Sequence, residues 1–384
     1  MLYRPEQFEP LTDEPWAEAR VRDAIRAIVA DVCDAYDPRG LWPAHEWDGW
    51  QAALPLKNLY VGAAGVVWAL DELEQRGHAE SGLDLPVAAE RALELWRAEP
   101  DFMAGETLPE PPEAALLTGE TGPLLVAWRL TGAAAHADDL LRLVGMNVGN
   151  EAEDLMWGAP GTLVAAAAVR DRSGEERWAE AARTTADALA ARRDADGLWV
   201  QRLWGTTFRG LGPAHGLVGN VRALLHVGDA RNDGLRRETA ATLARRADVE
   251  DGLANWSHEA KLQWCTGAPG IVAAAWDYLD EELLLAGAEL VWRAGAHRDE
   301  KGHGICHGTS GNGFALLKAF ARTGDERWLE RARRFAVHAL AQAERLAATA
   351  GRRRYSLWTG DLGTALFAAA CLDTDARYPI LDVL

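Results

Sequence analysis

A Gly-x-x-Gly element followed by an apolar, alanine-rich run recurs seven times in this chain of 384 residues. Successive copies are separated by 39 to 58 residues, counted between their first glycines. A period near 50 residues fits a repeating unit of two helices and two loops. The seven copies begin at Gly62, Gly119, Gly158, Gly216, Gly267, Gly308 and Gly360. The repeat therefore favours an array of helix pairs.

Two near-identical segments, residues 174–183 and 324–333, indicate what the second helix of a unit looks like. Each begins 13 residues after the second glycine of its motif and carries acidic residues in its first turn, where the helix dipole favours them. In the second segment and its continuation, one side is predicted to hold Trp328, Leu329, Phe335, Ala336 and Leu340. By contrast, the run after a motif, such as residues 271–276, is apolar nearly all round and is predicted to be buried.

Seven buried helices alternating with seven amphipathic ones predict an all-α fold, an α/α toroid with inner and outer helices. An open superhelix of helix pairs is the alternative. Because a closed ring cannot be divided into separate folding units, we expect one domain over residues 1–384. Residues 1–50 are expected to be an N-terminal segment packed on the ring, and residues 105–112, rich in Pro and Glu, a surface loop.

Composition excludes several classes of function. The formal net charge of −18 disfavours nucleic acid and anionic membranes as partners, because both require a basic face. No uncharged apolar run reaches the roughly 18 residues of a membrane helix, and the first residues lack the pattern of a secretory signal. Four widely spaced cysteines are too few for a disulfide scaffold. We therefore expect a cytoplasmic protein without a transmembrane segment.

Cys265 and Cys306 stand at the same place in the repeat, two residues before the first glycine of their motifs, and His307 follows Cys306 directly. Two thiolates and one imidazole can hold Zn²⁺ and leave its fourth position to water or substrate, as in catalytic zinc sites. A fourth position open to a thiol would make the protein a thiol-activating enzyme. His303 is a competing ligand, whereas Cys33 and Cys371 lie in helical runs and are expected to be small buried side chains.

Other catalytic motifs are missing from the sequence. It has no phosphate-binding loop ending in Lys-Ser/Thr, no His-Glu-x-x-His and no Gly-x-Ser-x-Gly. The 17 tryptophans would suit a carbohydrate-binding toroid, although most of them lie in helical runs where packing explains them. The glycines themselves have a purely structural interpretation, because small residues let crowded helix starts approach one another.

The segments Trp264-Cys265-x-Gly-x-Pro-Gly and Cys306-His307-Gly308, together with the seven motifs, resemble the lanthionine synthetase C-like (LanC-like) family over essentially the whole chain. The resemblance implies an α/α toroid and a zinc ion held by Cys265, Cys306 and His307. It also implies the family's cyclase reaction, in which a peptide cysteine adds to dehydroalanine or dehydrobutyrine to close a thioether ring. Zinc would lower the pKa of the thiol so that the nucleophilic thiolate exists near neutral pH.

The resemblance points to further residues for acid–base work. His215 directly precedes the fourth motif, and Asp154 lies four residues before the third; they match positions that the family uses to donate a proton and to orient the donor. Where some cyclases have Tyr after the first zinc cysteine this chain has Thr266, and where some have Arg four residues before it this chain has Lys261. Lys261 keeps the positive charge for a developing enolate but lacks the bidentate fork of Arg.

Three hypotheses follow. The first is a zinc-dependent LanC-like enzyme acting on a dehydrated precursor peptide, with dehydration left to a separate dehydratase. In a variant of it, the nucleophile is a small thiol, glutathione, and the acceptor a damaged protein. The second is a carbohydrate-active toroid without metal, and the third is a non-catalytic binding scaffold with structural zinc.

Overall fold

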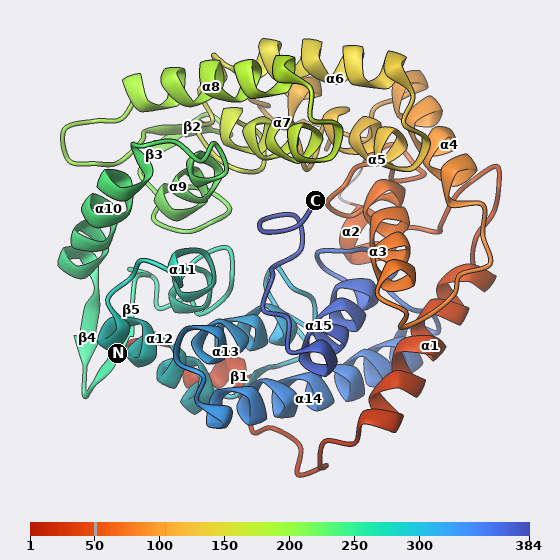
Figure 1. The fold of residues 1–384 in the computed structure, drawn as a ribbon. Coiled ribbons are helices and arrows are strands. Elements are labelled where there is room, and N and C mark those ends of the chain that lie inside the picture. Colours follow the sequence, from red (N-terminus) through yellow and green to blue (C-terminus); the bar gives the residue numbers. More distant parts are fainter. Residues whose placement is uncertain (50–51, 104) are drawn as a thin grey trace. The chain divides into compact units, whose positions relative to one another are not determined.

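Each of the seven Gly-x-x-Gly motifs begins a helix in the computed structural model, which describes residues 1–49, 52–103 and 105–384 (Figure 1). We call these seven the motif helices. Their first turns contain the second glycine, and proline at the second helical position of α7 and α11 needs no hydrogen-bond acceptor there. Their bounds are α3 (Ala63–Gln75), α5 (Thr121–Thr131), α7 (Ala159–Ser173), α9 (Leu217–Leu225), α11 (Ala268–Ala275), α13 (Thr309–Thr323) and α15 (Asp361–Asp373).

The motif helices are buried nearly all round, as their composition predicts. Every residue of α11 and the first eleven residues of α13 are buried. Three of these helices end at a glycine in the left-handed conformation, which residues with a side chain adopt less readily. Burial is thus most complete in the first turns of the motif helices, and exposed residues occur at the C-terminal ends of α5, α7 and α15.

Amphipathic helices alternate with the motif helices along the chain and pack against them. In the two segments that sequence repetition identified, α8 packs on α7 and α14 packs on α13, and Trp328, Leu329, Phe335, Ala336 and Leu340 are buried as predicted. The amphipathic helices are α4 (Leu85–Ala98), α6 (Ala134–Asn147), α8 (Glu176–Ala191), α12 (Glu281–Ala294) and α14 (Glu326–Ala350). Helix α10 (Asn232–Arg246) lies between α9 and α11 in the chain, but it is strongly polar and has no distinct apolar face.

The last motif helix has no amphipathic helix after it, and the N-terminal segment takes that place. Helix α1 (Glu18–Asp34) packs on α15 and buries Val21, Ile25, Ile28 and Val32. The expectation that residues 1–50 form an N-terminal segment packed on the ring stays a prediction.

The remaining elements are short. Helix α2 (Glu46–Gly49) and the 3-10 helices η1 (Pro5–Gln7) and η2 (Pro112–Ala114) lie in connecting segments. In the described ranges, six strands form three antiparallel pairs: β1 (Phe8–Glu9) with β6 (Ala296–His297), β2 (Gln201–Leu203) with β3 (Thr206–Phe208), and β4 (Asp248–Glu250) with β5 (Leu253–Asn255). These pairs are too small to change the class, and the all-α expectation is confirmed.

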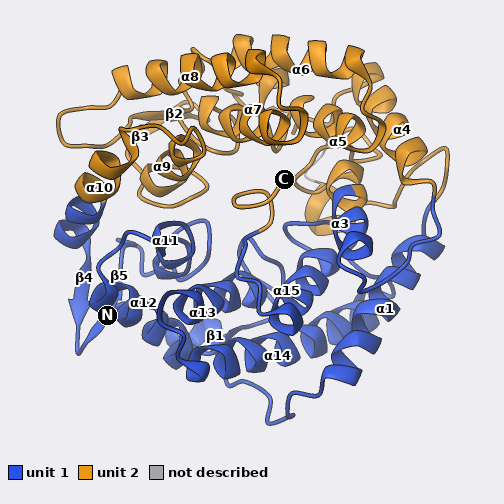
Figure 2. Cartoon of the chain, viewed as in Figure 1, with its two compact units in different colours: residues 1–36, 68–83, 240–378 blue, residues 37–67, 84–239, 379–384 orange. Residues whose placement is uncertain are grey.

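The described residues form two compact units (Figure 2). Unit 1 comprises residues 1–36, 68–83 and 240–378, and unit 2 comprises residues 37–67, 84–239 and 379–384. The expectation of a single domain stays a prediction. No helix in the described part of the chain is both long and apolar enough to cross a membrane.

Backbone hydrogen bonds connect the loops in front of successive motifs. In four places the residue two positions before a motif's first glycine donates its N–H to the carbonyl of the corresponding residue of the next motif, and we call these four bonds the loop ladder. In unit 2 it runs from Tyr60 to Leu117 (2.9 Å) and from Leu117 to Met156 (3.3 Å). In unit 1 it runs from Cys265 to Cys306 (3.3 Å) and from Cys306 to Trp358 (2.9 Å). Neighbouring loops thereby bring equivalent positions side by side.

Candidate metal centre

Cys265 is held by a tight turn in front of α11. Gln263 and Thr266 exchange backbone hydrogen bonds of 3.2 and 3.1 Å around it. Gly267, which follows, has φ of +114°, and a Cβ at this position would lie 2.4 Å from the carbonyl oxygen of Lys261. Only glycine allows both this backbone conformation and this close approach, so the motif glycine fixes the direction in which the loop presents Cys265.

Cys306 and His307 lie in the corresponding loop in front of α13. Aromatic side chains support this loop. Tyr378 donates a hydrogen bond to the carbonyl of Ile305, and its ring stacks on that of Trp264 with the ring centroids 5.0 Å apart. Because Trp264 and Ile305 immediately precede the two cysteines, one aromatic cluster positions both loops. Truncating a buried aromatic of this size costs about 3–5 kcal/mol, so this cluster contributes substantially to the stability of the region that carries the cysteine loops.

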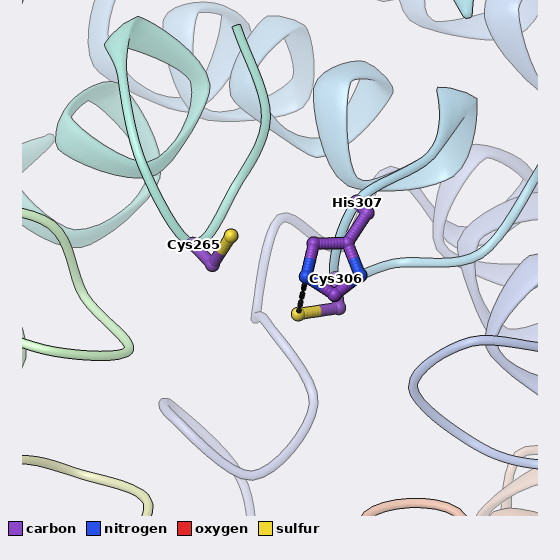
Figure 3. Close-up of side chains that lie close together, drawn as sticks. All are labelled: Cys265, Cys306 and His307. Carbon is purple, nitrogen blue, oxygen red and sulfur yellow. Dashed lines mark hydrogen bonds between the residues drawn. The ribbon is translucent and has the colours of Figure 1, made fainter. Parts of the chain in front are cut away.

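The structure brings the three predicted ligands together. One donor atom from each of Cys265, Cys306 and His307 lies within 4.8 Å of the other two, and Figure 3 shows the side chains facing one another from two separate loops. Cys306 Sγ lies 3.5 Å from His307 Nε2. Among the described residues this is the one cluster of His, Cys, Asp or Glu side chains of at least three members that could hold a metal ion.

The donor set fits Zn²⁺. Zinc–sulfur and zinc–nitrogen bonds of about 2.3 and 2.0 Å at tetrahedral angles separate two sulfurs by about 3.8 Å and a sulfur from a nitrogen by about 3.5 Å. The Cys306–His307 separation of 3.5 Å matches the second of these values. Two thiols and one imidazole are also the soft and borderline donors that zinc prefers. His303 lies outside the cluster, with Nε2 at 3.1 Å from Asp361 Oδ1 and Nδ1 at 2.9 Å from Thr364 Oγ1.

The surroundings favour the anionic form of Cys265. A hydrogen bond with Cys306 and the nearby imidazole of His307 hold the pKa of the Cys265 thiol well below its usual range, although burial opposes the effect. Gln263 Nε2 donates a further hydrogen bond of 2.9 Å to Cys265 Sγ. Elsewhere in unit 1, burial raises the pKa of Cys33 to about 11 and raises that of Cys371 still further. A metal binds the thiolate form of cysteine, so Cys265 is better suited to bind a metal than Cys33 or Cys371.

His297 also supports the metal loops, and sequence reasoning missed it. Its Nε2 lies 2.8 Å from the carbonyl oxygen of Leu262, in the segment that leads to Cys265, and its ring packs on Phe8 at 4.5 Å. Burial lowers the pKa of His297 to about 4, so the ring is neutral at physiological pH and donates from Nε2. The strand pairing of β1 with β6 that places Phe8 there has no signal in the repeat pattern.

His215 and Asp154 form a pair in unit 2. His215 Nδ1 hydrogen-bonds Asp154 Oδ2, while Asp154 Oδ1 accepts from the backbone N–H groups of Trp157 (2.7 Å) and Gly158 (3.2 Å). The Asp154 side chain is fully buried and that of His215 is 21% exposed. Gly216 follows His215 with φ of +152°. A buried carboxylate that is fixed by its own loop therefore orients a partly exposed imidazole.

Lys261 and Thr266 lie near Cys265 in the chain but take no part in the cluster. The Lys261 side chain is 48% exposed, and its Nζ lies 2.5 Å from Glu259 Oε2. Thr266 belongs to the turn around Cys265 through its backbone. Sequence reasoning also missed Trp204, whose ring centroid lies 5.2 Å from that of His215 at an interplanar angle of 75°.

The helical fold and the repeated motifs of this chain have counterparts among known proteins. The sequence profile described as "Lanthionine synthetase C-like protein" matches residues 56–383, so this chain belongs to the lanthionine synthetase C-like family. Among solved structures, nisin cyclase is similar over 92% of this chain and 94% of its own, with a TM-score of 0.57 and 15% sequence identity. That likeness concerns the fold and confirms the expected class, an α/α toroid.

A curated relative gives a second comparison. The Danio rerio protein named glutathione S-transferase LANCL1 is 30% identical to this chain over 132 residues. The matched region covers 32% of this chain and 31% of the relative, so it spans about a third of each protein.

Proposed function

We propose that this protein is a zinc-dependent enzyme that forms thioether bonds, adding a cysteine thiol to dehydroalanine or dehydrobutyrine within a peptide. The observation that carries the proposal is the cluster of Cys265, Cys306 and His307 in the motif loops of a LanC-like chain. Three protein donors are the number typical of catalytic zinc, whereas structural zinc usually has four.

Cys265, Cys306 and His307 would hold the ion. Bound zinc supplies Lewis acidity that lowers the pKa of a thiol, so that the nucleophile is present as a thiolate near neutral pH. The chain's own contribution is to keep the donors deprotonated and in place. The lowered pKa of Cys265 favours the first, and the loop ladder and the Tyr378–Trp264 stack favour the second.

The bond changes of the reaction require a proton donor, and the His215–Asp154 pair can supply it. The thiol loses its proton, the sulfur bonds to the β-carbon of the dehydrated residue, and the electrons of the double bond move toward the carbonyl to give an enolate. A proton must then reach the α-carbon. We assign this proton transfer to His215, oriented through Nδ1 by Asp154, and assign to Lys261 a supporting charge for the enolate.

The substrate follows from the same chemistry. Dehydroalanine and dehydrobutyrine arise from Ser and Thr by loss of water, so a separate dehydratase must supply the peptide. The fold likeness to nisin cyclase supports a peptide as the acceptor. A peptide that carries both a dehydrated residue and a cysteine would leave the enzyme with a thioether ring.

Zinc content tests the metal assignment. The wild-type protein is expected to contain one zinc per chain by elemental analysis, and Cys265→Ala is expected to contain little. Cys371→Ala is a matched control, because Cys371 is a buried thiol of the same unit that lies outside the cluster. An equal zinc content in wild type and Cys265→Ala would contradict the assignment of these residues as zinc ligands.

Ring formation tests the reaction. A short peptide with one dehydroalanine and one cysteine loses its alkylatable thiol on cyclisation while its mass stays the same, so alkylation followed by mass spectrometry measures turnover. We expect wild type and Cys371→Ala to consume the thiol and Cys265→Ala to leave it at the uncatalysed rate. Zinc binding without turnover of any dehydrated peptide would instead indicate a binding scaffold.

Addition of glutathione to dehydrated residues is the second candidate, favoured by the match to the relative named glutathione S-transferase LANCL1. Its chemistry is the same, with an external thiol in place of the peptide cysteine. A dehydroalanine peptide without cysteine separates the two: in the presence of glutathione its mass increases by one glutathione only if the external thiol is accepted. Comparing kcat/KM for the two peptides decides between the roles.

A further inference from the structure

Trp204 is an exposed tryptophan at the tip of the β2–β3 hairpin in unit 2. The register of the two strands pairs Leu203 with Thr206, which leaves Trp204 and Gly205 as a two-residue turn. Both turn residues have positive φ, +51° at Trp204 and +70° at Gly205, as a type I′ turn requires. The Trp204 side chain is 40% exposed.

Neither the turn nor the core accounts for a tryptophan at this position. Asn, Asp or Gly is preferred at the first position of a type I′ turn, because a bulky residue is strained at positive φ. The hairpin's own burial is achieved by Leu203, which is 2% exposed and packs with Trp157. Trp204 thus combines a strained backbone with a large apolar surface in solvent, and strained residues of this kind cluster at functional sites.

The hairpin is fixed to the loop that carries the histidine–aspartate pair. The buried side chain of Gln201 donates to the carbonyl of Glu153 (3.2 Å) and accepts from the N–H of Gly210 (2.8 Å). The N–H of Arg202 donates to the carbonyl of Glu151 (3.0 Å). Strand β2 is therefore bonded both to the segment before Asp154 and, through Gln201, to the segment that leads to His215.

These bonds hold the indole against the imidazole. The ring centroids of Trp204 and His215 are 5.2 Å apart at 75°, an edge-to-face contact, and both side chains keep part of their surface in solvent. A molecule that approaches the exposed part of His215 therefore approaches the indole as well.

We propose that Trp204 is a substrate-contacting residue that forms one side of the binding site at His215. The ligand is a peptide segment, and the indole packs against its planar dehydroalanine or dehydrobutyrine. The proposal rests on the proposed function, in which His215 returns a proton to that residue. An sp²-hybridised side chain conjugated with its carbonyl is flat and apolar, and an indole face offers complementary contact.

The test is steady-state kinetics with the dehydroalanine–cysteine peptide. Trp204→Asn removes the indole and inserts a residue that the type I′ turn accepts, so the hairpin is retained. We expect KM to rise about fivefold to tenfold, the size of one aromatic contact, with kcat changed less than about twofold. Trp204→Phe keeps a flat ring and is expected to restore most of the wild-type KM.

Trp47 provides a matched control. It is also an exposed tryptophan (43%) of unit 2, in edge-to-face contact with a histidine, His45, at 5.6 Å and 74°. Trp47→Asn is expected to leave KM and kcat unchanged. A general effect of losing a surface tryptophan would appear in both variants.

A binding measurement separates contact from a structural role. A dehydroalanine peptide without cysteine inhibits competitively, and its inhibition constant should rise in Trp204→Asn by more than that of the same peptide with serine. Equal changes for the two peptides, or an unchanged KM in an active Trp204→Asn variant, would overturn the proposal while leaving the proposed function in place. A wild-type protein that forms no thioether with peptide or glutathione would overturn both.

Discussion

Two loops of this protein use the same frame for different chemistry. In unit 1, Cys306 and His307 precede Gly308, and in unit 2, Ala214 and His215 precede Gly216. Each histidine occupies the position directly before the first glycine of a motif. The neighbour of His307 is a thiol, 3.5 Å from its Nε2, whereas the neighbour of His215 is the Asp154 carboxylate on its Nδ1.

The repeat therefore fixes where the loop side chains lie, and the neighbouring side chains determine what chemistry each histidine can perform. The loop ladder sets equivalent positions of adjacent loops side by side, so a cysteine two residues before each of two consecutive motifs gives a pair of thiols. With an imidazole beside them, these thiols form a set of soft metal donors. In unit 2 the loop that adjoins His215 supplies a buried carboxylate, which suits an imidazole that moves protons.

The strongest test of this comparison converts one loop into the sequence of the other. Cys306→Ala gives residues 306–308 the same Ala-His-Gly sequence as residues 214–216. Because one of only three donors is lost, we expect zinc to fall to near zero and thioether formation to drop about 1,000-fold or more. Elemental analysis and the alkylation assay measure both effects, with Cys33→Ala as the control. Full zinc content and full activity in Cys306→Ala would contradict the assignment of Cys306 as a zinc ligand.

The next test addresses the histidine of unit 2. His215→Asn should leave zinc unchanged and lower kcat about 100- to 10,000-fold, the usual contribution of general acid–base catalysis. His136 offers a matched control, since its Nε2 contacts Glu90 at 2.7 Å in the same unit but away from the motif loops. His136→Asn is expected to behave as wild type. If His215→Asn lost zinc as well, the division of roles between the two loops would be wrong.

A smaller effect is expected from the partner of that histidine. Asp154→Asn retains an oxygen that can accept from the Trp157 and Gly158 N–H groups, so the loop keeps its shape, but the charge that orients His215 is removed. Loss of such an orienting partner typically costs about 10- to 100-fold. The expected result is a lower kcat with unchanged zinc content and unchanged melting temperature. A loss no larger than that of His136→Asn would limit Asp154 to a structural role.

The sequence was sufficient for the features that depend on the repeat. The seven motifs predicted seven buried helices, and the common position of Cys265 and Cys306 predicted that their side chains meet, because equivalent positions lie side by side in the loop ladder. The same frame pointed to His215, and the structure pairs it with Asp154.

Contacts formed outside the repeat could not be predicted. Helix α1 packs on α15 from the opposite end of the chain, and Phe8 reaches His297 through a two-residue strand. Trp204 meets His215 through a hairpin inserted between two motif loops. Each of these contacts depends on a connection of individual length and bonding, for which periodicity carries no signal. The role of His297 further depends on burial, which lowers its pKa to about 4 and is a property of the folded chain.

The smallest expected effect concerns Lys261, whose position four residues before Cys265 suggested a charge for the enolate. Its side chain is 48% exposed and pairs with Glu259, and charges at such exposed sites contribute about 0.2–1 kcal/mol. Lys261→Ala should therefore lower kcat by about twofold to fivefold and leave zinc unchanged, and Lys261→Arg should restore activity. A fall of about 100-fold in Lys261→Ala would show that the lysine leaves Glu259 when substrate binds.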